Sequence, residues 1–416
     1  MTGRERLNMT LNHKNPDRVV VDFGSTAVTG IHVSCVAALR ERFGLEKRPV
    51  KVCEPYQMLG EIDEDLRQAM GIDTIGAPAP ATIFGFKNEN WKEFTAPWGQ
   101  QLLVAEKFNT TRDDNGDLLM CPQGDLEAPP SGRMPEGGFF YFFFIRQEPI
   151  DEDKLNPEHN LEEFGPVRKE DLKYYADQAE HLSKSDYGIV GGIGGAALGD
   201  IALVPAPFMK HPRGIRDVAE WYISTAARQD YVHSVFAGQT DYAIANLEKI
   251  HEAAGEVWDV VFICGTDFGT QNSSFCSTET FQNLYAPYYR RINDWIHANT
   301  GWKTFKHSCG AVENFMEDFI ECGFDIINPV QCSAAGMDPE ILKERYGDRI
   351  VFWGGGVDTQ STLPFGKPEE VRRQALERCE IFASDGGFVF NTIHNLQAGT
   401  PVENIMAMLE AVREFN

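Results

Sequence analysis

The chain has 416 residues, of which 42% are hydrophobic and 24% charged, and its formal net charge is -24 at pH 7. This composition is typical of a soluble globular protein without a bilayer-spanning segment, and the excess acid argues against duplex nucleic acid or an anionic membrane as a partner. Nine cysteines without a C-x-x-C pair, behind the polar start MTGRERLNMTLN, favour a reducing cytoplasm and no secretion signal.

Apolar runs that predict strands alternate with helical patterns along most of the chain. The predicted strands are Val19–Phe23, Ile72–Pro78, Tyr187–Gly195, Asp259–Gly265, Lys303–Ser308, Asp325–Gln331, Arg349–Gly355 and Gly387–His394. Eight near-continuous apolar strands separated by amphipathic helices predict an α/β protein built as a (β/α)8 TIM barrel. An open doubly wound sheet is the alternative, and Ile201–Pro207 is a candidate for a ninth strand.

The pattern changes between about residues 84 and 165, where short alternating pieces are separated by turn signals such as DDNG and PEGG. This predicts a small antiparallel β insertion in a single barrel domain that covers residues 1–416. The aromatic run Phe139–Phe144 alternates between both faces of a strand, which favours core packing over stacking on a ligand.

The stretch FKHSCG, residues 305–310, ends the strand predicted at Lys303–Ser308. A period of two places His307 and Cys309 on the same side of the strand, and an imidazole with a thiolate binds zinc well. The alternative is a hydrogen-bonded core histidine beside a small buried cysteine.

Chemistry in a barrel of this kind takes place at the C-terminal ends of the strands. His394 ends the last predicted strand across the mouth from His307 and Cys309, which gives a His, Cys, His set with an open fourth position, as a catalytic zinc requires. Cys332 is the rival third ligand. The other strand-end candidates, which would orient the ligands or contact substrate unless they are ordinary loop residues, are Asp22, Asp267, Gln331, Asp358 and Gln360.

Four stretches in this order resemble the uroporphyrinogen decarboxylase superfamily: NPDRVVVDFG, DVVFICGTDFGTQNSSFCSTETFQNLYAPYYRRINDWIH, FKHSCG and NTIHNLQAGTPVENIMAMLEAV. The H-x-C-G element is similar to that of its corrinoid-dependent methyltransferase branch. The resemblance implies a barrel with its site at the mouth and, in that branch, zinc held by His-x-Cys and by a Cys before a TP-x-EN segment. His307 and Cys309 match the first two positions, and by its spacing from Thr400 and Pro401 the third is His394 instead of Cys.

The departure at the third position bears on the chemistry that the resemblance implies. A site with one thiolate makes zinc a stronger Lewis acid, which suits an ether or amine leaving group. The true decarboxylases also carry a His before TP-x-EN, but their R-Q-A-G-R substrate motif is missing where this chain has VVVDFGST, and they have no counterpart of HSCG. The resemblance therefore favours the methyltransferase.

We expect a zinc-dependent methyltransferase that moves a methyl group between a small methyl ether or methylamine and cobalamin. The chain has no D-x-H-x-x-G corrinoid motif, so the cobalamin would arrive on a separate corrinoid protein. One alternative is a metal-free decarboxylase of the porphyrinogen type, in which Asp22 and His394 contact substrate. Another is a non-catalytic barrel that binds a small ligand. The helical surface is apolar enough for a homodimer, with no face singled out.

Overall fold

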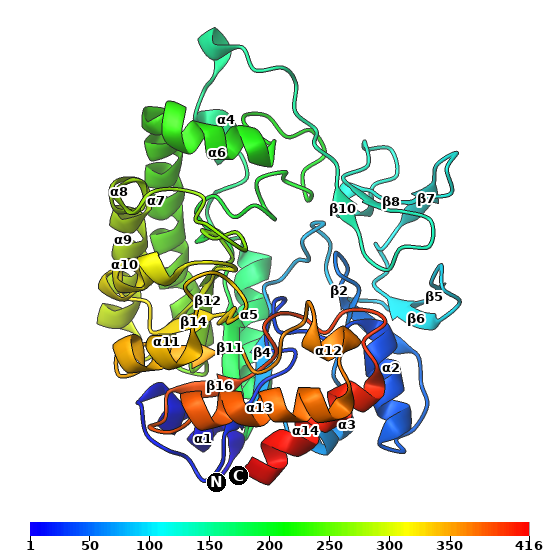
Figure 1. Ribbon diagram of the computed structural model, residues 1–416. Helices are drawn as coiled ribbons and strands as arrows, with labels where there is room; N and C mark the ends of the chain where they lie inside the picture. The colour runs from blue at the N-terminus through cyan, green and yellow to red at the C-terminus, as the bar shows by residue number, and fades with distance from the viewer. Residues whose placement is uncertain (416) are drawn as a thin grey trace.

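Eight parallel strands form the centre of the molecule, with helices packed around them (Figure 1). The computed structural model describes residues 1–415. The strands are hydrogen-bonded in the order β1-β16-β15-β14-β13-β12-β11-β4. Their bounds are β1 (Val20–Val21), β4 (Thr74–Ala77), β11 (Gly188–Gly192), β12 (Val260–Cys264), β13 (Lys303–His307), β14 (Ile326–Asn328), β15 (Val351–Trp353) and β16 (Phe388–Phe390). Each lies within a predicted apolar run, which confirms the predicted barrel.

One backbone hydrogen bond and the side chain of Asp73, rather than a strand ladder, join the two ends of this sheet, β1 and β4. Asp73 precedes β4, and its backbone N–H donates to the carbonyl of Val21 at 2.8 Å while its carboxylate accepts the N–H of Val21 at 3.0 Å. The same carboxylate forms ion pairs with Arg18 at 2.7 Å and Arg6 at 3.1 Å. The barrel is therefore nearly closed, as in a TIM barrel, and the open-sheet alternative was wrong.

The helices cover the outside of the sheet, and one helix closes its lower end (Figure 1). Their bounds are α1 (Gly3–Leu11), α2 (Val33–Arg42), α3 (Glu64–Met70), α4 (Glu158–Leu161), α5 (Lys169–Leu182), α6 (Val218–Ala227), α7 (Gln229–Ala254), α8 (Thr278–Thr280), α9 (Ala286–Asn299), α10 (Met316–Glu321), α11 (Pro339–Tyr346), α12 (Thr362–Phe365), α13 (Pro368–Phe382) and α14 (Val402–Phe415). Leu7 and Leu11 of α1 pack against Val20, Val190 and Phe305 inside the barrel. The N-terminal end of the barrel is thereby sealed, which leaves the C-terminal end for a site.

The candidate ninth strand at Ile201–Pro207 does not form. The structure describes successive turns there instead. The N–H groups of Leu203 and Val204 both donate to the carbonyl of Asp200 at 2.8 Å, and Ala206 has a positive φ of 49°. Val204 and Ala206 of this loop are buried, so hydrophobicity alone was a misleading signal for a strand here.

Two small sheets lie beside the barrel (Figure 1). One has the order β10-β9-β8-β7 and is antiparallel, and the other has the order β3-β2-β6-β5. Their bounds are β2 (Val50–Glu54), β3 (Leu59–Gly60), β5 (Lys92–Thr95), β6 (Gln101–Val104), β7 (Thr110–Arg112), β8 (Leu118–Met120), β9 (Gly132–Met134) and β10 (Phe142–Phe143). Strands β5 to β10 fall inside the predicted insertion, and β2 and β3 come before it. The division into domains stays a prediction.

Within residues 1–415, no helix combines the length and the apolar character that crossing a bilayer requires.

Candidate metal centre

His307 is the last residue of β13, and Cys309 lies two residues beyond it. Phe305, two residues before His307, belongs to the apolar cluster inside the barrel. Because side chains two apart share one side of a strand, His307 lies on the inner side of the barrel, one layer nearer the mouth. His307 is 3% exposed, whereas Cys309 is partly exposed. The thiol therefore lies on the solvent side of the imidazole.

The turn that carries Cys309 depends on a close approach of two backbones. Gly310 has a φ of +88°, and a Cβ at this position would lie 2.4 Å from the carbonyl carbon of Gly269. The N–H of Cys309 donates to Asp267 Oδ1 at 2.7 Å, and the N–H of Gly310 donates to Gln331 Oε1 at 2.8 Å. The loop after β12 and a side chain beyond β14 thus fix the backbone that presents the thiol.

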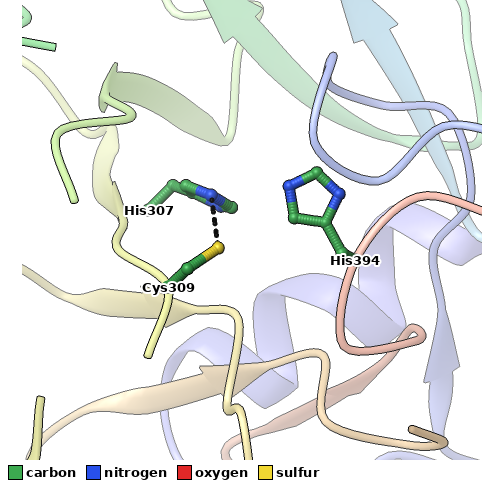
Figure 2. A group of neighbouring side chains, drawn as sticks. All are labelled: His307, Cys309 and His394. Carbon is green, nitrogen blue, oxygen red and sulfur yellow. Dashed lines mark hydrogen bonds between the residues drawn. The ribbon is translucent and has the colours of Figure 1, made fainter. Parts of the chain in front are cut away.

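His394 reaches the same point from the loop after β16, on the opposite side of the barrel mouth (Figure 2). One ligand atom from each of His307, Cys309 and His394 lies within 4.8 Å of the other two. The imidazole centroids are 5.4 Å apart with an interplanar angle of 79°, and His307 Nε2 lies 3.4 Å from Cys309 Sγ. The structure therefore brings together the three side chains that the sequence proposed as ligands.

A buried asparagine fixes the proton of His307. Asn328 Nδ2 donates to the carbonyl of Trp353 at 2.8 Å, so its Oδ1 faces His307 and accepts from Nδ1–H at 2.6 Å. A neutral imidazole with its proton on Nδ1 has a free lone pair on Nε2. That lone pair points toward Cys309, as a metal ligand requires.

Burial sets the charge of the three side chains. Desolvation lowers the pKa of His307 to about 4, opposed by the hydrogen bond to Asn328 and reinforced by the charge of Lys306. Desolvation likewise lowers the pKa of His394 to about 4. Burial raises the pKa of the Cys309 thiol well above its usual value, and the nearby Asp267 carboxylate raises it further. At neutral pH the site therefore contains two neutral imidazoles and a thiol.

The three residue types fit zinc by chemistry, and the pair His307 and Cys309 also fits it by spacing. Zinc takes Cys sulfur at about 2.3 Å and His nitrogen at about 2.0 Å, so tetrahedral angles place the two ligand atoms about 3.5 Å apart. The 3.4 Å separation of His307 Nε2 and Cys309 Sγ matches this edge. His394 completes a set of three protein ligands, which is the number that leaves a catalytic zinc with one open position.

Asp22 is not part of the group formed by the three candidate ligands. Its carboxylate accepts hydrogen bonds from Thr74 Oγ1 at 2.6 Å, Trp353 Nε1 at 2.8 Å and Ser25 Oγ at 2.9 Å. Burial raises its pKa, and the hydrogen bonds oppose that shift. Since the carbonyl of Trp353 accepts from Asn328, hydrogen bonds connect Asp22 with His307 through Trp353 on β15 and Asn328 on β14.

Three of the other candidates lie away from the centre. Asp358 Oδ1 accepts the N–H groups of Gln360 at 2.6 Å and Ser361 at 3.0 Å, which makes it a loop residue, and Gln360 is exposed. The rival ligand Cys332 donates to the carbonyl of Val330 at 3.5 Å and lines a surface hollow near α13. Among residues 1–415, the group that could hold a metal ion is His307, Cys309 and His394, and Cys332 is not part of it.

The sequence interpretation missed two asparagines of the site, Asn328 and Asn395. Asn328 is two residues after Ile326, which faces the barrel interior, so alternation along the strand could have placed it beside His307. Asn395 N–H donates to His394 Nδ1 at 2.8 Å, a contact between neighbours for which the sequence holds no signal.

Comparisons with known proteins agree with this architecture. A family model described as Uroporphyrinogen decarboxylase (URO-D) matches residues 145–415. The methylated-thiol–coenzyme M methyltransferase of Methanosarcina mazei is 26% identical over 222 residues, which cover 51% of this chain and 53% of that protein. The uroporphyrinogen decarboxylase of Anaeromyxobacter dehalogenans is 23% identical over 263 residues, 60% of this chain and 66% of that protein. The chain thus spans about half the length of the methyltransferase relative.

A solved structure, a methyltransferase from Methanosarcina mazei, superposes over 100% of this chain and 99% of its own with a TM-score of 0.55. At 17% sequence identity this similarity concerns the fold.

Proposed function

The chain belongs to the uroporphyrinogen decarboxylase family, and from this premise we propose that it is a zinc-dependent methyltransferase. It moves a methyl group between a small methylated compound and the cobalamin of a separate corrinoid protein. The observation that carries the proposal is the approach of His307, Cys309 and His394 to within 4.8 Å at the C-terminal ends of the strands. The similarity to a relative named as a methyltransferase supports the same assignment.

Zinc at this centre supplies a Lewis acid that polarises the heteroatom bearing the methyl group. His307 is held ready to bind it, because Asn328 keeps the proton on Nδ1. Cys309 contributes the single negative charge of the ligand set, and Asp267 fixes its backbone N–H. Cys309 and His394 are partly exposed, so a small substrate approaches from their side of the centre.

The charges around the centre support a small neutral or cationic methyl donor, such as a methyl ether or a methylamine. Among the described residues, Asp22, Asp200 and Asp267 have side-chain carboxyl groups near the mouth but no ion-pair partner within 4.0 Å. Burial raises the pKa of Asp200 to about 6, which leaves it largely ionised at pH 7. Lys306 donates to the carbonyls of Thr266 and His307 and is fully buried. The ionised carboxylate of Asp200 would repel the carboxylates of a porphyrinogen.

The proposal is tested by methyl transfer to a reduced corrinoid. Purified protein is mixed with cob(I)alamin and, in turn, a methyl ether, a methylamine and a methyl thioether, and the absorbance change from Co(I) to methyl-Co(III) is followed. We expect turnover with at least one donor, loss of turnover in Cys309→Ala, and restoration by zinc after chelation of the wild-type protein. Turnover of a porphyrinogen by metal-free protein, with no methyl transfer from any donor, would support the decarboxylase instead.

A further inference from the structure

The hydrogen bond at His394 places its proton on the nitrogen that faces the other two ligands. A backbone N–H can only donate, so His394 Nδ1, which receives the N–H of Asn395 at 2.8 Å, is an acceptor. A neutral imidazole has one proton, and here that proton must be on Nε2. Figure 2 shows Nε2 directed toward His307 and Cys309.

The two histidines of the centre are therefore held in opposite tautomers. His307 has its proton on Nδ1, where Asn328 Oδ1 accepts it, and a lone pair on Nε2. His394 has its lone pair engaged on Nδ1 and a proton on Nε2. Only His307 offers a metal a lone pair without rearrangement.

We propose that His394 is an exchangeable third ligand, whereas His307 and Cys309 hold the metal permanently. The inference rests on the zinc centre of the proposed function. To bind through Nε2, His394 must release the N–H of Asn395 and move its proton from Nε2 to Nδ1. The imidazole stays neutral in both states, so this exchange takes up and releases no net proton.

The backbone of Asn395 is held in place by its side chain. Its N–H group therefore always favours the tautomer of His394 that cannot bind zinc through Nε2. Asn395 is buried, and its side chain makes three hydrogen bonds to two other segments: Oδ1 accepts the N–H of Gly30, while Nδ2 donates to the carbonyl of Ala27 at 2.9 Å and to Gln57 Oε1 at 3.1 Å. Breaking one neutral hydrogen bond lowers a binding constant by about two- to tenfold. That cost weakens His394 as a ligand but leaves it able to bind.

Exchange gives His394 a second use. When Nδ1 accepts from Asn395, the Nε2–H group faces the open side of the centre and can donate to a heteroatom with a lone pair. A donor aimed at the atom on which negative charge develops stabilises the transition state of the transfer. This role requires an oxygen, sulfur or nitrogen acceptor in the substrate.

The tautomers can be read directly in the metal-free wild-type protein. With 15N-histidine labelling, long-range proton–nitrogen correlation spectra distinguish Nδ1–H from Nε2–H, and His307→Gln and His394→Gln assign the two rings. We expect Nδ1–H at His307 and Nε2–H at His394. A proton on Nδ1 of His394 would overturn the inference without any need for zinc or turnover.

Zinc affinities provide the second readout, measured by competition with a chromophoric chelator. We expect both variants to lose zinc affinity. The loss in His394→Ala should be at least about tenfold smaller than the loss in His307→Ala. His32→Ala is the matched control, because His32 is a buried histidine outside the centre whose ring is bound by Ser34 and Phe139. It should leave the affinity unchanged.

The outcomes separate the inference from the function on which it rests. Equal losses in His307→Ala and His394→Ala, in protein that binds zinc, overturn the exchange of His394 and leave the proposed centre intact. Wild-type protein that binds no zinc overturns both. If an alanine variant does not fold, the wild-type tautomer measurement still decides.

Discussion

Burial fixes the protonation of the ligands before any ion binds, and this has a measurable consequence at the residue scale. The pKa values of His307 and His394 lie near 4, so both rings are neutral above about pH 5 and lose no proton to a metal. The pKa of Cys309 is raised well above its usual value, so its thiol must lose one proton when zinc binds.

We therefore predict release of about one proton per zinc between roughly pH 5.5 and 8.5, with an apparent affinity that rises about tenfold per pH unit. Zinc affinity rises with pH because a higher pH helps to remove the proton of the Cys309 thiol, which zinc binding requires. Calorimetric titration in buffers of different ionisation enthalpy measures the number of protons. Release of two or three protons would show that the imidazoles are charged in the metal-free protein.

Asn328 is predicted to affect zinc affinity through its hydrogen bond to His307 and not as a ligand. Asn328→Leu removes the acceptor for His307 Nδ1–H, so the ring is free to take either tautomer and to rotate. We expect zinc affinity to fall by about 10- to 100-fold. Asn293→Leu is the control, because Asn293 is equally buried and donates to the carbonyl of Cys322, away from the site. A similar loss of affinity in both variants would indicate general destabilisation.

The sequence suggested the candidate ligands but not the groups that orient them. His307, Cys309 and His394 could be proposed because strand ends meet at one face of a barrel. The partner of His307 depends on the register of β13 and β14, which pairs His307 with Asn328, and register follows from the packed sheet rather than from spacing. Asp358 was a plausible candidate for the same reason, yet its carboxylate is used by its own loop.

At the scale of single elements, the turn after β13 is where the position of the thiol is decided. Gly310→Ala would place a Cβ 2.4 Å from the backbone of Gly269 and impose a positive φ on alanine. We expect loss of zinc binding and a lower unfolding free energy by more than about 2 kcal/mol, because two backbones must separate. Chelator competition and urea unfolding measure the two effects.

The control for this variant is Gly44→Ala. Gly44 has a positive φ of 67°, but a Cβ there would meet nothing within 4 Å. It should cost only about 1 kcal/mol and leave zinc affinity unchanged. If Gly310→Ala behaved in the same way, close approach of the two loops would not be what positions Cys309.

The elements themselves were largely predictable, since strands buried on both faces appear as continuous apolar runs. All eight barrel strands were found in this way. The prediction of a candidate strand at Ile201–Pro207 was wrong. These apolar residues lie in a loop, where the carbonyl of Asp200 accepts two backbone N–H groups. Periodicity does not distinguish a buried loop from a short strand.

At the scale of the whole molecule, the core residue Leu7 and the candidate ligands lie at opposite ends of the barrel. Leu7 is fully buried at the lower end, where α1 seals the barrel, and the candidate ligands lie at the other end. We predict that Leu7→Ala lowers the unfolding free energy by about 2–5 kcal/mol, through lost burial and a cavity, and changes zinc affinity less than about twofold.

Urea unfolding and chelator competition test this separation, with Leu126→Ala as the control because Leu126 is 54% exposed. The control should change the unfolding free energy by less than about 0.5 kcal/mol. An affinity that falls in step with stability in Leu7→Ala would mean that the two ends of the barrel are coupled.

Metal analysis of protein purified without chelator decides whether His307, Cys309 and His394 form a zinc centre. We predict about one zinc per chain in the wild-type protein and less than about a tenth of that in His307→Ala and Cys309→Ala. Wild-type protein with far less than one zinc per chain, or a zinc content unchanged in both variants, would contradict it.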